Sequence, residues 1–153
     1  MNTNNCALWV PATPFRAVIV YLMETYRMPW RVIAHAAGVA SPVVRGILHG
    51  RVIGGVRKRS TKIRTIDAKA LYNLLVNADR LAKHPANQLL LRRNVRLLAV
   101  NRPQAMRYLP LYPDEIKALL AGHPVWASAW QQAWVSAVCE AYRVHDDDDL
   151  LAA

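Results

Sequence analysis

The sequence predicts an all-α protein, with a helical bundle over residues 1–82 followed by a second, small helical domain over residues 83–153. Apolar residues recur three or four positions apart through most of the chain, as they do on one face of a helix. Prolines, serines and threonines stand where these stripes begin, and glycines stand where several of them end. One short stretch combines β-branched residues with a glycine turn, in the manner of paired strands.

Three helices are expected before residue 50. Residues 1–12 are expected to be loosely structured, and a threonine and a proline at positions 13 and 14 then signal the start of a first helix, which is expected over residues 15–26. A second helix is expected over residues 29–37, and a third over residues 41–49, closed by Gly50. The turn between the second and third helices carries the clearest signal in the sequence.

This turn has a residue of a suitable type at each position. Gly38 can adopt the positive φ that ends a helix without a Cβ penalty, and Val39 then packs into the core. Ala34 is small where the two helices must cross closely. Ser41 is expected to cap the third helix, and Pro42 suits its first turn, where no N–H is needed. Two short helices joined by a tight glycine turn have the layout of a DNA-reading helix-turn-helix, so we expect a bundle of this type.

The third helix is expected to present one face to DNA, because Val44, Ile47 and Leu48 form its inward stripe. Arg45 is the sharpest candidate for reading sequence, since an arginine there can bond both O6 and N7 of guanine in the major groove. Gly46 weakens a helix by about 1 kcal/mol relative to alanine, but it would permit a close approach to DNA. The residues left to face a DNA groove are Ser41, Pro42, Val43, Arg45, Gly46 and His49.

The segment 51–64 is strongly basic. From Arg45 to Lys69 the sequence has eight basic residues and a single acidic one, Asp67. A Gly-Gly turn within it indicates either a short hairpin, or wing, or an irregular basic loop, of which the loop is favoured. Beside a recognition helix, such cations are expected to bind phosphates or enter a minor groove. These candidates are Arg51, Arg57, Lys58, Arg59, Lys62 and Arg64, and Arg31 on the second helix is expected to hold the DNA backbone.

Helices are also expected in the rest of the chain. A helix capped by Thr65 closes the first domain near residue 80, and its inward face consists of Ala68, Leu71, Tyr72, Leu74 and Leu75. A further helix covers residues 86–100, where Arg92 and Arg96 lie one turn apart and could extend a DNA footprint. Three prolines break the next segment into short pieces. A final long helix is expected to start at residue 124 or 125 and to place three tryptophans in the core or an interface, namely Trp126, Trp130 and Trp134.

The amino-acid composition limits the classes of function that we expect for this protein. The formal net charge of +10 favours a polyanionic partner, and double-stranded DNA fits the motif beside it. No apolar run reaches the roughly 18 to 20 residues that a membrane span needs, and no signal peptide is recognisable, so we expect a cytoplasmic protein without a membrane partner. Cys6 and Cys139 lack metal-type spacing and are expected to be free thiols. Without histidine ligand spacing, a glycine-rich phosphate loop or paired acids, we expect no metal, no cofactor and no enzymatic activity.

Residues 30–50, followed by the basic segment and the leucine-rich helix at 65–76, resemble the phage-type helix-turn-helix repressors. The arginine-rich linker, the tryptophan-rich C-terminal half and the small size are similar, more narrowly, to the immunity repressors of temperate mycobacteriophages. This resemblance implies a bacteriophage DNA-binding protein for transcription regulation, which represses lytic genes in the host cytoplasm, maintains lysogeny and gives immunity to superinfection. It also implies asymmetric operator and stoperator sites bound without a two-fold dimer.

The resemblance places four residues on the outward face of the recognition helix, namely Ser41, Pro42, Arg45 and His49. Pro42 and Gly46 depart from the polar residues most common in that family. The sequence has no heptad zipper with flanking charges, which favours a monomer on DNA, while a dimer formed through a tryptophan-rich face is the alternative.

Two other functions are compatible with the sequence. One is an antitoxin-like protein-interaction module, which regulates its own gene through the helix-turn-helix while its tryptophan-rich half binds a partner. The other is an accessory domain of a recombination enzyme, against which the lack of catalytic carboxylates argues. The acidic run from Asp146 to Asp149 is expected to be a solvated tail or an acidic patch that keeps this end off DNA.

Overall fold

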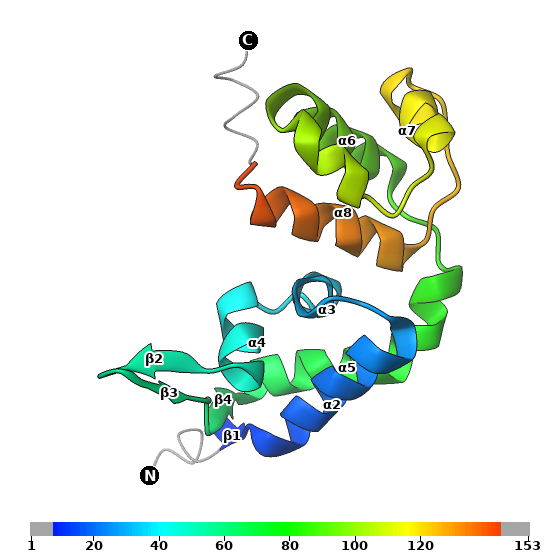
Figure 1. Cartoon of the computed structure of the whole chain (residues 1–153). Coiled ribbons are helices and arrows are strands. Elements are labelled where there is room, and N and C mark those ends of the chain that lie inside the picture. Colours follow the sequence, from blue (N-terminus) through cyan, green and yellow to red (C-terminus); the bar gives the residue numbers. More distant parts are fainter. Residues whose placement is uncertain (1–7, 145–153) are drawn as a thin grey trace. The chain divides into compact units, whose positions relative to one another are not determined.

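The computed structural model describes residues 8–144, and the chain divides into two units after Asp79. The described residues are mostly helical, as predicted, but they also form two antiparallel sheets of two strands each (Figure 1). Helix α5 (Thr65–Lys83) continues across the boundary between the units and ends close to the domain boundary expected after residue 82. The expectations for Cys6 and for the run from Asp146 to Asp149 concern residues outside the described part.

Three short helices make up the first unit together with α5. They are α2 (Thr13–Tyr26), α3 (Trp30–Ala37) and α4 (Ser41–Leu48), and each packs against the other two. Their positions match the predicted helices because the start and stop signals are local. The fully buried large side chains of this unit come from all four helices and include Ile19, Leu22, Val32, Ile33, Val44, Ile47 and Leu71.

The turn between α3 and α4 has the expected glycine geometry. Gly38 has φ 74°, and its N–H donates to the carbonyls of Ala34 and His35. The Val39 N–H donates to the Ala34 carbonyl at 3.0 Å, which completes a Schellman motif, and Val39 is 5% exposed. The prediction for Ser41 was wrong, since Ala40 occupies the N-cap position and no side chain caps α4. Pro42 contributes no N–H to the first turn, so the helix start has one donor fewer to satisfy.

The basic segment forms a hairpin and not the favoured irregular loop. Strand β2 (Arg51–Ile53) pairs with β3 (Val56–Lys58), and the register places Arg51 opposite Lys58 and Ile53 opposite Val56. The two turn glycines both have positive φ, 59° and 79°, which is the pattern of a type I′ turn. Gly50, with φ 79°, precedes the hairpin, and a Cβ there would collide with the Lys58 carbonyl.

A second strand pair was not predicted. Strand β1 (Trp9–Pro11) pairs antiparallel with β4 (Lys62–Arg64), so residues 9–11 are ordered and not loose as expected. Val10 lies opposite Ile63, which is 3% exposed and closes the core at this end of the unit. The strand pair anchors the far end of the basic segment, because β4 leads directly into α5.

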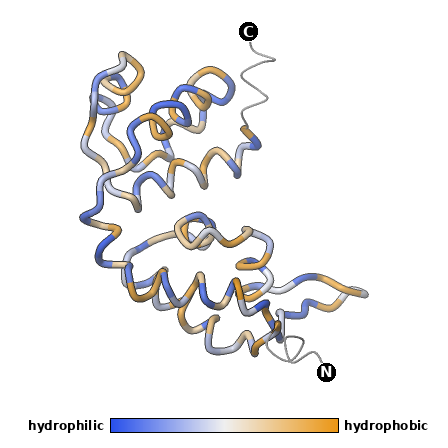
Figure 2. Tube along the Cα trace, turned by 180° about the vertical axis from the view of Figure 1, so that it is seen from behind, coloured by the Kyte–Doolittle hydropathy of each residue, from blue (hydrophilic) through white to orange (hydrophobic). Residues whose placement is uncertain are grey.

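The second unit is built around α6 (Gln88–Asn101), which packs against the 3-10 helix η1 (Pro103–Tyr108), α7 (Pro113–Leu120) and α8 (Ala129–Ala141). Its core includes Leu91, Val95, Leu98, Leu119 and Val135, all fully buried. Hydrophobic and hydrophilic residues alternate along the helices, as expected for helices with one apolar face (Figure 2).

Two of the predicted apolar faces need correction. Helix α8 begins at Ala129 and not at residue 124 or 125, because Ser128 and Gln131 form a capping box there. Trp126 therefore precedes the helix and is 64% exposed, whereas Trp130 is 2% exposed. On α5, Tyr72 is 58% exposed and does not belong to the inward face.

Candidate nucleic-acid interface

The outward face of α4 is smaller than the sequence predicted. Pro42, Arg45 and His49 are exposed and Val43 is half-buried, while the predicted inward stripe of Val44, Ile47 and Leu48 is buried. Ser41, expected on the outward face, is 6% exposed and therefore lies against the protein. The exposed positions follow one another by three and four residues, so they form one continuous stripe along the helix.

Gly46 has a different role from the one predicted, because the segment after the hairpin covers it. The Ser60 N–H donates to the Gly46 carbonyl at 2.9 Å, and a Cβ built on Gly46 would lie 2.7 Å from the Ser60 Oγ. The close approach that the missing side chain permits is therefore to Ser60 of the same chain. This contact holds the end of the hairpin segment against α4.

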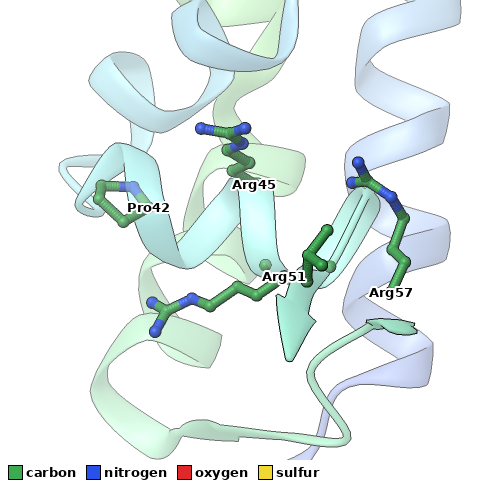
Figure 3. A pocket seen from close by; sticks show the side chains of 7 residues that line it. Pro42, Arg45, Arg51 and Arg57 are labelled. Atoms are coloured by element: carbon green, nitrogen blue, oxygen red, sulfur yellow. The ribbon is translucent and has the colours of Figure 1, made fainter. Parts of the chain in front are cut away.

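An open groove lies between the outward stripe of α4 and the hairpin, and residues of both line it. Figure 3 shows the side chains of Pro42 and Arg45, from α4, around this groove with those of Arg51 and Arg57, from the hairpin. A neighbouring hollow is lined by His49, Arg57 and Arg59, together with Leu48. Arg57 lies between the two, and its Nη1 donates to the His49 carbonyl at 3.2 Å. The hairpin and the exposed stripe of α4 thus form one continuous surface.

Arg16 of α2 connects the end of α4 to the segment after the hairpin, a role that the sequence analysis did not predict. Its Nε donates to the Ile47 carbonyl at 2.7 Å, and its Nη2 donates to the Ser60 carbonyl at 3.2 Å. A cation is favourable at the C-terminal end of α4, where backbone carbonyls accumulate partial negative charge. No local signal could have revealed this role, since the partners are 31 and 44 residues away in the sequence.

The surface is strongly positive. The basic residues predicted to bind phosphates are all exposed, namely Arg51, Arg57, Lys58, Arg59, Lys62 and Arg64. The sequence has no Asp or Glu between Tyr26 and Asp67, so no acid on the segment itself offsets these charges. Asp67, 7% exposed, accepts a hydrogen bond from Arg64 Nε at 3.2 Å and partly neutralises that end.

Arg31 borders the same surface from the start of α3. Its guanidinium carbon lies 4.8 Å from the centroid of the Trp30 ring, a cation–π distance. The Trp30 ring in turn meets the His49 ring edge to face, with centroids 6.5 Å apart. These contacts place both Arg31 and His49 against the Trp30 ring, at the start of α3 and the end of α4.

The two arginines predicted in the second unit differ in their surroundings. Arg92 is half-buried, and its Nη2 donates to the Gly122 carbonyl at 3.0 Å, just after α7 ends. Arg96 is exposed one turn later, and both line a hollow with Arg93. Arg92 therefore ties α7 to α6, while Arg96 is open to a ligand.

Within residues 8–144, no group of three or more His, Cys, Asp or Glu side chains could hold a metal ion. None of the helices described there is long and apolar enough to cross a membrane. Cys139 is a free, 7% exposed thiol, and burial raises its pKa to about 11.

Comparison of the chain with models of protein families, with curated proteins and with solved structures gives no match. Function is therefore inferred from the surface that α4 and the hairpin form.

Proposed function

We propose that this chain is a sequence-specific double-stranded DNA-binding protein that represses transcription. In this proposal α3 and α4 act as a helix-turn-helix, and α4 is the recognition helix in the major groove. The observation that carries the proposal is the continuity of the exposed stripe Pro42, Arg45 and His49 with a basic hairpin that has no acidic residue. An open surface with many cations and no acidic residue on the hairpin is what a DNA duplex, with its phosphates, requires of a binding partner.

The residues of the surface would divide between base reading and backbone binding. Arg45 is exposed in the middle of α4 and would bond O6 and N7 of a guanine, while Pro42 and Val43 offer apolar atoms to a thymine methyl. His49 would touch a base or the backbone. The phosphates would be held by Arg51, Arg57, Lys58, Arg59 and Lys62, with Arg31 beside them.

The resemblance to the immunity repressors of temperate mycobacteriophages supplies the biological role in this proposal. The protein would bind operator and stoperator sites in the host cytoplasm, repress lytic genes and maintain lysogeny. Such sites are asymmetric, so one chain would be sufficient for each. Arg96, which is exposed on α6, is the residue of the second unit through which the footprint could be extended.

The proposal is tested by comparing two affinities of the full chain, one for promoter DNA from its own genome and one for random duplex, at about 150 mM salt. We expect the promoter DNA to bind at least about 1,000-fold more tightly. Six phosphate-binding cations, Arg31 included, predict that the logarithm of the association constant falls with the logarithm of salt concentration with a slope of about −5. Equal affinities for the two DNAs would refute sequence-specific binding.

A further inference from the structure

The tip of the hairpin is apolar and uncovered. Val52, Ile53 and Val56 are 63%, 60% and 56% exposed. Ile53 and Val56 are a cross-strand pair directly before and after the glycine turn, so the two side chains stand together at the end of the hairpin. In Figure 2 the hairpin is hydrophobic near its tip and hydrophilic along its arms.

The tip is framed by positive charge on the same face. Side chains alternate between the two faces of a strand, so Arg51 and Lys58 lie on the face of Ile53 and Val56, two pairs further from the turn, with Val52 and Arg57 between them on the other face. Arg57 and Arg59 add charge on the remaining side, and all four basic side chains are exposed. An apolar end between basic flanks is complementary to a nucleic-acid groove, where phosphates border a floor of stacked bases.

We propose that the Ile53–Val56 tip enters the minor groove of the bound duplex and wedges between two base pairs, while Arg51 and Lys58 bind the phosphates on either side. The wedge would unstack one base step and kink the DNA. This inference rests on the proposed function, because α4 must first place the hairpin beside a duplex.

Only the tip of the hairpin would enter the groove. Strand axes lie about 4.7 to 4.9 Å apart, so the ribbon with its side chains is wider than an undistorted minor groove of about 6 Å, and the proposed kink would have to widen the groove. The turn consists of Gly54 and Gly55, which have no side chain to block entry. Isoleucine is among the side chains that architectural proteins insert between base steps, with kinks of about 20 to 90°.

The wedge would add specificity at a position that α4 does not reach. Pyrimidine–purine steps unstack most easily, so the proposed kink favours a TA or CA step where the tip enters. Arg45 would recognise hydrogen-bonding groups of the bases in the major groove. Ile53 and Val56 would favour base steps that deform easily in the neighbouring minor groove of the same site.

The experiment uses the full chain and short duplexes that it selects from a randomised pool. Fluorescent donor and acceptor dyes at the duplex ends report bending, and 2-aminopurine at the predicted step reports unstacking. The variant Ile53→Thr/Val56→Thr keeps β-branched side chains in both strands but makes the tip polar. Lys58→Ala is the matched control, since it removes one flanking charge and keeps the tip.

We expect the wild-type protein to raise both energy transfer and 2-aminopurine fluorescence. The double threonine variant should lose both signals and bind about 3- to 10-fold more weakly, with the salt dependence unchanged. Lys58→Ala should keep both signals while its salt slope falls by about one.

The failures of the two proposals can be told apart. If the wild type selects and binds duplexes without bending them, or if the double threonine variant bends them equally, the wedge is refuted and the DNA-binding proposal stands. If no duplex is enriched from the pool, the proposed function itself fails. The wedge is also refuted if the tip residues instead mediate binding to vesicles of equal phosphatidylserine and phosphatidylcholine, or self-association in sedimentation equilibrium.

Discussion

Replacing Gly46 by alanine tests how the hairpin segment is held against α4. The substitution would gain about 1 kcal/mol of helix propensity, but the new Cβ would lie 2.7 Å from the Ser60 Oγ. Moving the Ser60 side chain out of its rotamer costs about 0.5–1.5 kcal/mol. We therefore expect Gly46→Ala alone to change the free energy of unfolding by less than about 0.5 kcal/mol, because the two effects nearly cancel.

Removing the Ser60 hydroxyl should reveal the gain. In Ser60→Ala the nearest remaining atom is the Cβ of residue 60, at 4.0 Å from the new methyl, which is an ordinary contact. Gly46→Ala should then stabilise the protein by about 1 kcal/mol, so the two substitutions are coupled by about 1 kcal/mol.

Urea unfolding of the wild type, both single variants and the double variant, followed by circular dichroism, measures this coupling. The four m-values should agree, which shows that the substitutions leave the surface exposed on unfolding unchanged. The same effect of Gly46→Ala with and without the Ser60 hydroxyl would refute the packing of Ser60 over α4.

Three further predictions concern groups around and beyond this surface. Arg16→Ala removes two charged hydrogen bonds and should destabilise the protein by about 2–4 kcal/mol in urea unfolding, with Arg16→Lys in between; a loss below about 0.5 kcal/mol would contradict the role of Arg16. The hydrogen bond that the Tyr26 hydroxyl donates to Asp79 raises the pKa of Tyr26 to about 12, and burial adds to the shift. The hydrogen bond therefore contributes fully to stability below about pH 10, and this contribution is lost as the pH rises through about 12. Phenolate absorbance should show one tyrosine that titrates late, and this step should be missing in Tyr26→Phe. Identical titrations of the wild type and Tyr26→Phe would contradict the raised pKa of Tyr26. In a Cys6→Ser background, the buried Cys139 should react with Ellman's reagent at neutral pH after unfolding, and fast reaction of the folded protein would contradict its burial.

The sequence predicts those features that depend on one residue type at one place. Gly38 ends α3 because positive φ favours glycine, and the buried stripe of α4 follows from helical spacing. The start of α8 carried such a signal too, since Ser128 and Gln131 match a capping box. The four-residue spacing of Trp126 and Trp130 obscured it, because an apolar residue before a helix can fall in register with the stripe by chance.

The features that the sequence did not predict depend on contacts between distant residues. Strand β1 exists because β4 pairs with it, more than fifty residues later. Burial of Gly46 under Ser60 and the bonds of Arg16 likewise join segments whose proximity is known only once the chain is folded. The helix and the basic segment that form the candidate surface could therefore be found from the sequence, while the side chains that they expose were only partly predicted.

The central claim is that α4 reads base pairs while the hairpin holds the DNA backbone. A specificity profile measured at each position of randomised duplexes, for the wild type, Arg45→Ala and Arg57→Ala, tests it most directly. We predict that Arg45→Ala loses discrimination at one or two base pairs, by about 5- to 150-fold, while Arg57→Ala weakens all sequences alike. An Arg45→Ala profile identical to that of the wild type, or a wild type without any preference, would contradict the claim.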